Sequence, residues 1–204
     1  RSSPSVGDNV SGLGPAQTEK WFDYLENPEE MNWDGRLEIA LPEYPGVTFR
    51  WYPEKMEAVT ENEITPLYTG MPIWNTYFCD LTGDGLPELC STITFGSGII
   101  DSRVIVYDYA NGASYTLEDR GKYDYSLRLD GSDGSLCVVQ RAHDSGDIAA
   151  VGELFFSDSG LHLQVIKTNF ETHKFTSVTI RNNGEAPCTL RLAPMKQLFP
   201  QAKK

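Results

Sequence analysis

Residues 73–95 read Ile-Trp-Asn-Thr-Tyr-Phe-Cys-Asp-Leu-Thr-Gly-Asp-Gly-Leu-Pro-Glu-Leu-Cys-Ser-Thr-Ile-Thr-Phe, and this stretch decides the fold. Its two ends, 73–78 and 89–95, are rich in aromatic and β-branched residues, which favour strands. Between them lie Asp, Thr, Gly and Pro residues of the kind that form tight turns. The stretch therefore predicts two antiparallel strands joined by an acidic loop.

Oxygen-bearing groups recur at alternating positions of this loop, and Gly85 permits a sharp turn between them. Hard cations such as Ca²⁺ are bound by oxygen ligands in this arrangement. The loop predicts a structural calcium site with five ligands: the side chains of Asp80, Thr82, Asp84 and Glu88 and the backbone carbonyl of Leu86. The alternative is a metal-free turn in which the acidic side chains accept backbone N–H groups.

The composition excludes one class of function. The chain has 204 residues, 40% of them hydrophobic, which is enough for a sizeable core without metals or disulfides. Its formal net charge is -12 and its pI is about 4.6. Nucleic-acid binding depends on clustered Lys and Arg side chains that neutralise phosphates, so we expect no nucleic-acid partner. An acidic protein surface suits an extracellular environment that is rich in cations.

The chain is predicted to form a single mainly-β domain at residues 18–194, with a sub-boundary near residues 144–152. Residues 1–17 are rich in Ser, Gly and Pro and are expected to be a flexible linker that leaves an upstream part of a longer protein. Residues 195–204 are expected to be a basic tail. No apolar run of 18 residues occurs, so the sequence predicts no transmembrane helix within this chain.

Strand-like runs separated by turn residues recur along the chain. The clearest hairpin signal is 103–117, where Asn111-Gly112 can supply the positive φ angles of a type I′ turn. Similar runs occupy residues 36–41, 47–52, 125–129, 136–141, 152–157, 161–167, 174–181 and 188–192. This spacing predicts an antiparallel meander, a sandwich, or a small barrel or propeller-like sheet. One short N-terminal helix is expected at residues 18–26, where the apolar residues fit an amphipathic pattern.

The sequence also makes predictions for three tryptophans, one acidic segment and two cysteines. Three tryptophans are predicted core residues: Trp33, Trp51 and Trp74. Residues 54–66 are acidic and weakly patterned, and we expect a solvated loop or face there. Cys79 and Cys90 flank the acidic loop and would meet across its base, either as a disulfide or as two small buried thiols.

The sequence lacks the common motifs of zinc and nucleophilic catalysis. Its four cysteines form no CxxC pair, which argues against a structural zinc site. The three histidines, at 143, 162 and 173, lie far apart and form no HExxH motif. Gly96-Ser97-Gly98 lacks the Gly-x-Ser-x-Gly pattern of a nucleophile elbow. These observations favour a chain that is not an enzyme.

The loop resembles the calcium loops of FG-GAP and VCBS repeats, which are extracellular β repeats reading roughly Asp-x-Asn-x-Asp-Gly-x-x-Asp-hydrophobic between two strands. Six residues fall on this pattern: Asp80, Thr82, Asp84, Gly85, Glu88 and Leu89. The resemblance covers residues 73–117. Thr82 stands where the repeats have Asp or Asn, and Glu88 where they have a final Asp. A neutral ligand in place of a charged one implies weak affinity, with Kd about 0.1–1 mM.

A longer resemblance covers residues 21–141. Residues 70–92, Gly-Met-Pro-Ile-Trp-Asn-Thr-Tyr-Phe-Cys-Asp-Leu-Thr-Gly-Asp-Gly-Leu-Pro-Glu-Leu-Cys-Ser-Thr, together with 95–101 and 106–112, are similar to the C-terminal extracellular region of BlaR/MecR-type membrane metallopeptidases of Gram-positive gut bacteria. The resemblance implies a module outside the cell, tethered through residues 1–17, that passes a signal to a membrane-embedded protease. The peptidase zinc motif and the Ser-x-x-Lys and Lys-Thr-Gly elements of penicillin sensing do not occur here.

These observations predict a non-catalytic extracellular sensor or ligand-binding module, either tethered to the cell surface or secreted. Its expected partners are a small molecule, a peptide or a glycan, and the membrane-embedded part of its parent protein. The alternative is a secreted hydrolase of cell-wall or glycan material that uses Asp80, Asp84 or Glu88 as acid and base. A third alternative is a purely adhesive or structural β module.

Overall fold

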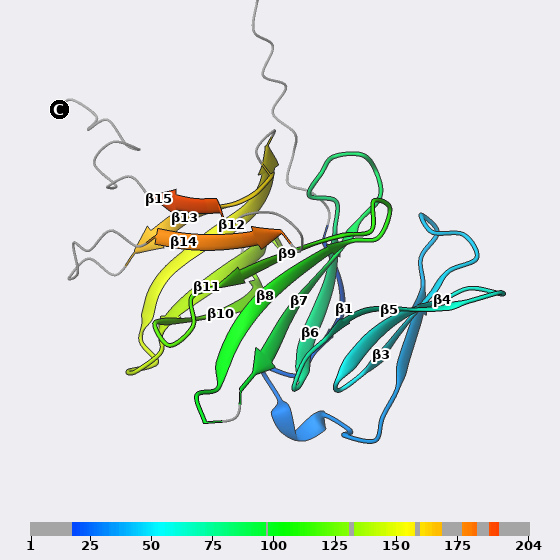
Figure 1. The fold of residues 1–204 in the computed structure, drawn as a ribbon, viewed down its shortest axis with the longest axis horizontal. Coiled ribbons are helices and arrows are strands. Elements are labelled where there is room, and N and C mark those ends of the chain that lie inside the picture. Colours follow the sequence, from blue (N-terminus) through cyan, green and yellow to red (C-terminus); the bar gives the residue numbers. More distant parts are fainter. Residues whose placement is uncertain are drawn as a thin grey trace, which may run out of the picture.

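The computed structural model describes residues 18–96, 98–130, 133–157, 160–168, 177–182 and 188–191. These residues form three antiparallel sheets that do not close into a barrel (Figure 1), so the predicted mainly-β fold class is confirmed and the arrangement is that of a sandwich. The predicted linker at 1–17 and tail at 195–204 lie outside the described residues.

The largest sheet has seven strands in the order β1-β6-β7-β8-β9-β14-β15. Their bounds are β1 (Thr18–Asp23), β6 (Ile73–Cys79), β7 (Glu88–Phe95), β8 (Asp101–Asp108), β9 (Ala113–Glu118), β14 (Ser177–Asn182) and β15 (Cys188–Arg191). A second sheet joins β10 (Tyr123–Leu129), β11 (Leu136–Ala142), β12 (Ile148–Ser157) and β13 (Gly160–Thr168) in that order. A third joins β2 (Leu37–Ala40), β3 (Thr48–Tyr52), β4 (Lys55–Val59) and β5 (Ile64–Thr69).

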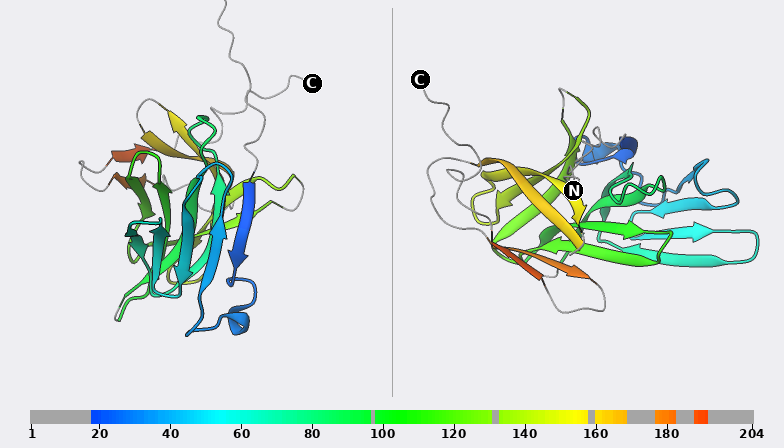
Figure 2. Two further views of the ribbon diagram at one scale, coloured as in Figure 1. Left: turned by 90° about the vertical axis from the view of Figure 1, so that its right-hand side faces the viewer. Right: turned by 90° about the horizontal axis from the view of Figure 1, so that it is seen from above.

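The β6–β7 hairpin is covered on both faces. Successive side chains of a strand point to opposite faces, so Tyr77 joins the core shared with the second sheet while Phe78 joins the core shared with the third. Seven of the eight residues of β7 are buried. Because both faces are covered, polar residues of these strands, among them Asn75, Ser91 and Thr92, are buried together with the apolar ones. Figures 1 and 2 show the two smaller sheets on either side of these central strands.

Side chains of the central hairpin also bind the edge of the second sheet. Asn75 is fully buried; its Oδ1 accepts the Thr92 N–H at 2.9 Å and its Nδ2 donates to the Leu127 carbonyl at 3.0 Å. The Thr92 hydroxyl oxygen in turn accepts the Leu127 N–H at 2.8 Å. Leu127 lies on β10, the first strand of its sheet, so two side chains provide hydrogen bonds that a neighbouring strand would otherwise supply.

The predicted N-terminal helix is wrong. Residues 18–23 form β1, which pairs antiparallel with β6 from Thr18 opposite Cys79 to Asp23 opposite Asn75. The Trp21 and Phe78 rings stack with centroids 5.8 Å apart. The short amphipathic pattern is compatible with a helix or a strand. Residues 18–23 form a strand because the open edge of β6 offers backbone hydrogen-bond partners. The one helix among the described residues is η1 (Pro28–Glu30), a single 3-10 turn.

The hairpin predicted at 103–117 is confirmed as β8 and β9, but its turn is not type I′. Asp108 pairs with Ala113, so residues 109–112 make the connection. Gly112 has φ of 63°, whereas Asn111 does not have a positive φ. Instead, the two oxygens of the Asp108 carboxylate accept the N–H and the side-chain Nδ2 of Asn111. These two local hydrogen bonds stabilise a four-residue connection, which is longer than the two-residue turn that the Asn-Gly pair predicts.

Two further expectations are corrected. Residues 54–66 are not a solvated loop, since they contain β4 and the start of β5, and Glu57 is 8% exposed between Arg50 and Lys55. Pairing with these basic side chains lowers the cost of burying the Glu57 carboxylate.

Of the three tryptophans predicted to lie in the core, Trp51 is in the core at 1% exposure and Trp74 is half-buried, but Trp33 is 61% exposed.

We expect Asn75→Ala to lower the free energy of unfolding by about 2–4 kcal/mol, because it leaves the buried Thr92 N–H and Leu127 carbonyl without partners. Urea denaturation measures the change. Asn62→Ala, in the exposed turn between β4 and β5, is the matched control and should change stability little. Equal stabilities for the two variants would contradict the proposed role of Asn75.

Candidate metal centre

The acidic loop connects β6 to β7 at one end of the central sheet (Figure 1). Cys79, the last residue of β6, pairs with Glu88, the first residue of β7, so the hairpin brings the two ends of the loop together. Gly83 and Gly85 have φ angles of 75° and 85°. This left-handed backbone favours glycine, and it lets residues 80–87 fold back on themselves.

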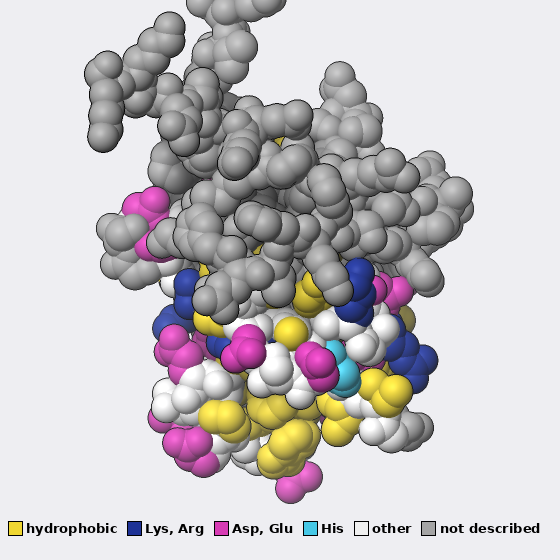
Figure 3. Space-filling view, turned by 90° about the vertical axis from the view of Figure 1, so that its left-hand side faces the viewer, with side chains coloured by type: hydrophobic (Ala, Val, Ile, Leu, Met, Phe, Trp, Pro, Cys, Tyr) yellow, Lys and Arg dark blue, Asp and Glu magenta, His cyan; other side chains and the backbone are white. Residues whose placement is uncertain are grey.

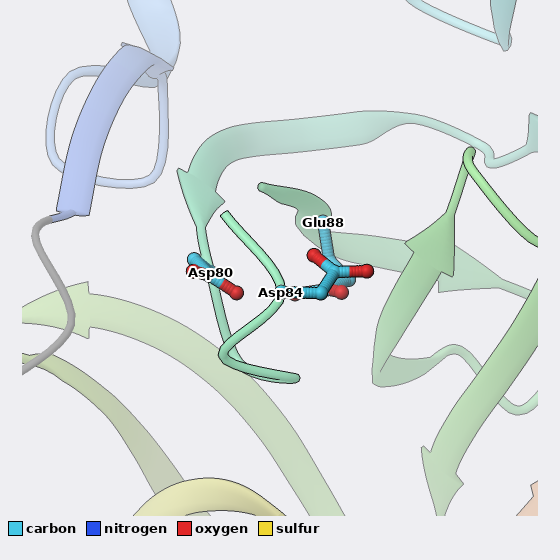
Figure 4. Close-up of side chains that lie close together, drawn as sticks. All are labelled: Asp80, Asp84 and Glu88. Carbon is cyan, nitrogen blue, oxygen red and sulfur yellow. The ribbon is translucent and has the colours of Figure 1, made fainter. Parts of the chain in front are cut away.

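Three of the five predicted ligands meet within this loop. One carboxylate oxygen from each of Asp80, Asp84 and Glu88 lies within 4.8 Å of the other two, a spacing that could hold a metal ion. Figure 4 shows the Asp84 and Glu88 carboxylates side by side, with Asp80 across the loop from them. Asp84 is exposed, Asp80 is half-buried and Glu88 is 1% exposed. No other group of three His, Cys, Asp or Glu residues in the described part of the chain has this geometry.

The carboxylates also accept hydrogen bonds from the loop. The two oxygens of Asp80 accept the N–H groups of Gly83 and Gly85 at 2.7 and 2.9 Å. Asp84 accepts the Leu86 N–H at 2.8 Å. These are the bonds that the metal-free alternative predicts. They do not conflict with a cation, because a carboxylate oxygen that accepts one hydrogen bond has a second lone pair for a metal.

Thr82, the fourth predicted side-chain ligand, contacts Glu88. Its hydroxyl donates to Glu88 Oε1 at 3.0 Å, while the Leu81 N–H donates to Glu88 Oε2 at 2.7 Å. Thr82 therefore orients the buried carboxylate, and its own oxygen keeps lone pairs for a cation. Leu86 is predicted to provide a fifth ligand through its backbone carbonyl, and its N–H donates to Asp84 Oδ1.

Burial strongly disfavours the charged form of Glu88. Desolvation raises the pKa of Glu88 to about 7, although the bonds from Leu81 and Thr82 act in the opposite direction. The nearby Asp108 carboxylate makes a smaller contribution to this increase in pKa. Asp108 is itself buried, and it lies one position beyond the Leu89–Tyr107 pair, which places it across the strands from Glu88. Two buried carboxylates beside an acidic loop create a local excess of negative charge that a cation would relieve.

Sequence reasoning missed two residues of this centre. Tyr44, from the loop between β2 and β3, donates its hydroxyl to the Pro87 carbonyl at 3.0 Å and so holds the loop from outside. Asp108 belongs to β8. Both residues approach from segments remote in the sequence, and neither has a local signal beyond its place next to a turn.

Cys79 and Cys90 are free thiols. Cys79 pairs with Glu88, which puts Cys90 two residues further along β7 and diagonally across from Cys79. Both side chains are buried in the core between the central and second sheets. The structure thus has the second of the two predicted arrangements, in which these residues act as small hydrophobic side chains.

Polar side chains outside the acidic loop form ordinary local contacts. Asp133 accepts the Ser135 N–H at 2.9 Å in a turn. His143 Nδ1 lies 2.9 Å from Asp124 Oδ2, and Asp124 Oδ1 accepts the Ser102 N–H. Acidic side chains on the face in Figure 3 are scattered among basic and neutral ones. His162 and His173, with the turn residue Ser97, lie where no side chain is described.

A pH titration of stability tests the environment of Glu88. The folded state keeps the Glu88 proton up to about pH 7, whereas the unfolded state releases it near the ordinary value of 4.5. In the presence of a metal chelator, the contribution of Glu88 to the free energy of unfolding should therefore fall by about 2–3 kcal/mol from pH 5 to pH 8. Urea denaturation at both pH values should show this fall in the wild type and not in Glu88→Gln.

The exposed variant Glu61→Gln is the matched control, and it should retain the wild-type pH profile. A parallel pH profile for the wild type and Glu88→Gln would contradict the burial of an ionisable group at this position.

Comparison with known proteins adds no relative to this description. No family model, no curated protein and no solved structure matches the chain. In the described part of the chain, no helix has the length and hydrophobicity needed to cross a membrane. The resemblances to calcium-binding β repeats and to membrane metallopeptidases remain predictions.

Proposed function

We propose that the chain is a non-catalytic extracellular sensor or ligand-binding module in which calcium stabilises the β6–β7 hairpin. The observation that carries the proposal is the convergence of the Asp80, Asp84 and Glu88 carboxylates within 4.8 Å of one another at the tip of the central hairpin. A cation there would cross-link both ends of the loop and balance the charge of a buried carboxylate.

The chemistry of the donors favours calcium over other metals. The loop offers carboxylate, hydroxyl and carbonyl oxygens, which suit calcium or magnesium and not the softer transition metals. Magnesium requires near-ideal octahedral geometry at short distances, whereas calcium accepts irregular sites with more ligands. A loop that mixes exposed Asp84 with buried Glu88 is an irregular site of this kind.

The proposed location follows from the expected affinity. A site with three carboxylates and one neutral hydroxyl should bind calcium with Kd about 0.1–1 mM, the range of extracellular modules. Such a site fills only where calcium is abundant, which favours a position outside the cell. The resemblance to the exterior region of BlaR/MecR-type proteins supports a role as the sensing part of a longer, membrane-anchored protein.

The alternative of a hydrolase has one observation in its favour. A pKa of about 7 for Glu88 is suitable for a general acid. However, Glu88 is 1% exposed and both of its oxygens accept hydrogen bonds from the loop, so a substrate has no direct access to it. Calcium would also hold these carboxylates ionised, and the two roles exclude each other.

Calcium titration followed by thermal melting tests the proposal. At 10 mM calcium and pH 7.5, the midpoint of unfolding should rise by about 3–8 °C, as expected for a ligand at 10 to 100 times its Kd. Asp84→Ala removes an exposed ligand without disturbing the core and should abolish most of the shift. Magnesium at the same concentration should produce a smaller shift.

Asp133→Ala is the matched control, because Asp133 makes the same type of turn hydrogen bond outside the acidic loop. This variant should keep the full calcium shift. An absent shift in the wild type, or an equal shift in Asp84→Ala, would rule out calcium at this loop.

A further inference from the structure

Beside the acidic loop, the surface forms an open hollow of about 500 Å³. It lies where the β2–β3 connection, the acidic loop and the β8–β9 turn meet at one end of the sandwich. The residues that matter for its chemistry are Glu43, Tyr44, Val47, Leu86, Tyr107 and Tyr109. Leu86 connects the hollow to the acidic loop, since it lines the hollow and its N–H donates a hydrogen bond to Asp84.

The aromatic walls of the hollow are held in place by the core. The rings of Tyr44 and Tyr109 meet edge-to-face with centroids 5.3 Å apart, and Tyr109 makes a second edge-to-face contact with Phe49. Tyr107 contacts the buried Tyr68. Tyr107 and Tyr109 nevertheless stay half-exposed. Their surfaces are therefore available to a ligand and need little ordering when one binds.

The charge around the hollow is negative. Glu43 is exposed on its rim, and no Lys or Arg is among the residues that line it. Glu88, Asp108, Asp84 and Asp80 all lie close enough to Tyr44 to act on its hydroxyl electrostatically. Aromatic faces beside carboxylates attract cations, because the π-system and the carboxylate both present negative charge.

We propose that this hollow binds a basic peptide, with a Lys or Arg side chain lying against Tyr107 and Tyr109 and its charged group directed toward Glu43. The apolar stem of such a side chain fits against Val47 and Leu86. An open hollow suits a side chain that projects from a longer chain, whereas sites for free small molecules enclose most of the ligand surface. The inference builds on the proposed function and names the class of ligand.

Binding can be tested with the synthetic peptide acetyl-Gly-Lys-Gly-Lys-Gly-Lys-Gly-amide, using amide chemical shifts of the labelled protein. The experiment is run in the presence of a metal chelator, so that no metal ion competes with the peptide for the carboxylates. We expect shifts centred on residues 107–112 and 43–47, and weaker binding as salt is raised. The same peptide with Glu in place of Lys should cause none.

Glu43→Gln should weaken binding of the lysine peptide about two- to fivefold, and Tyr107→Leu should have a similar effect, as expected for cation–π and charge contacts at an exposed site. Glu61→Gln is the matched control and should bind as the wild type does. Melting curves establish that each variant is folded, so that a loss of binding reports on the hollow.

Absence of lysine-peptide binding, equal binding of the glutamate peptide, or shifts produced instead by a neutral oligosaccharide would overturn the inference. The proposed calcium site is judged separately by the melting experiment. A calcium shift without peptide binding refutes only the peptide, and peptide binding without a calcium shift refutes only the metal.

Discussion

Burial of the β6–β7 hairpin on both faces is the constraint on which the rest of the structure depends. Tyr77 and Phe78 point into two different cores, and each core needs its own covering sheet. Asn75 and Thr92 then fasten the edge of one covering sheet to the hairpin through buried hydrogen bonds. A hairpin held in this way can carry a charged loop at its tip, because the closely packed strands below do not adapt to it.

The position of Glu88 connects the core to the candidate site. This residue begins β7, pairs with Cys79 and is almost fully buried, yet its carboxylate belongs to the acidic loop. A buried carboxylate is unfavourable unless it is protonated, hydrogen-bonded or balanced by a cation. Hydrogen bonds from Leu81 and Thr82 satisfy it in part, and its raised pKa reflects the remaining cost. Its raised pKa makes the charge of the loop sensitive to pH, and the three carboxylates of the loop could hold a metal ion.

The strands and the acidic loop were predictable from the sequence because both have local signatures. Turn residues separate β-branched runs throughout the chain, and Asp80, Asp84 and Glu88 have a ligand spacing that survives folding. Short segments were predicted less well. Residues 18–23 fit a helix in isolation and became β1 because β6 offered an open edge. Asn111 fits a type I′ turn in isolation, but the Asp108 carboxylate stabilises a different one.

By itself, the sequence determined the mainly-β class, the hairpin around residues 73–95 and the row of oxygen-bearing side chains in its loop, since these follow from residue types within a few positions of one another. Only the tertiary structure decided which side chains surround that loop. Tyr44 and Asp108 reach it from distant strands and turns, and the tyrosine-lined hollow exists only where three connections meet. Contacts of this kind depend on how sheets pack, and sheet packing is a property of the whole chain.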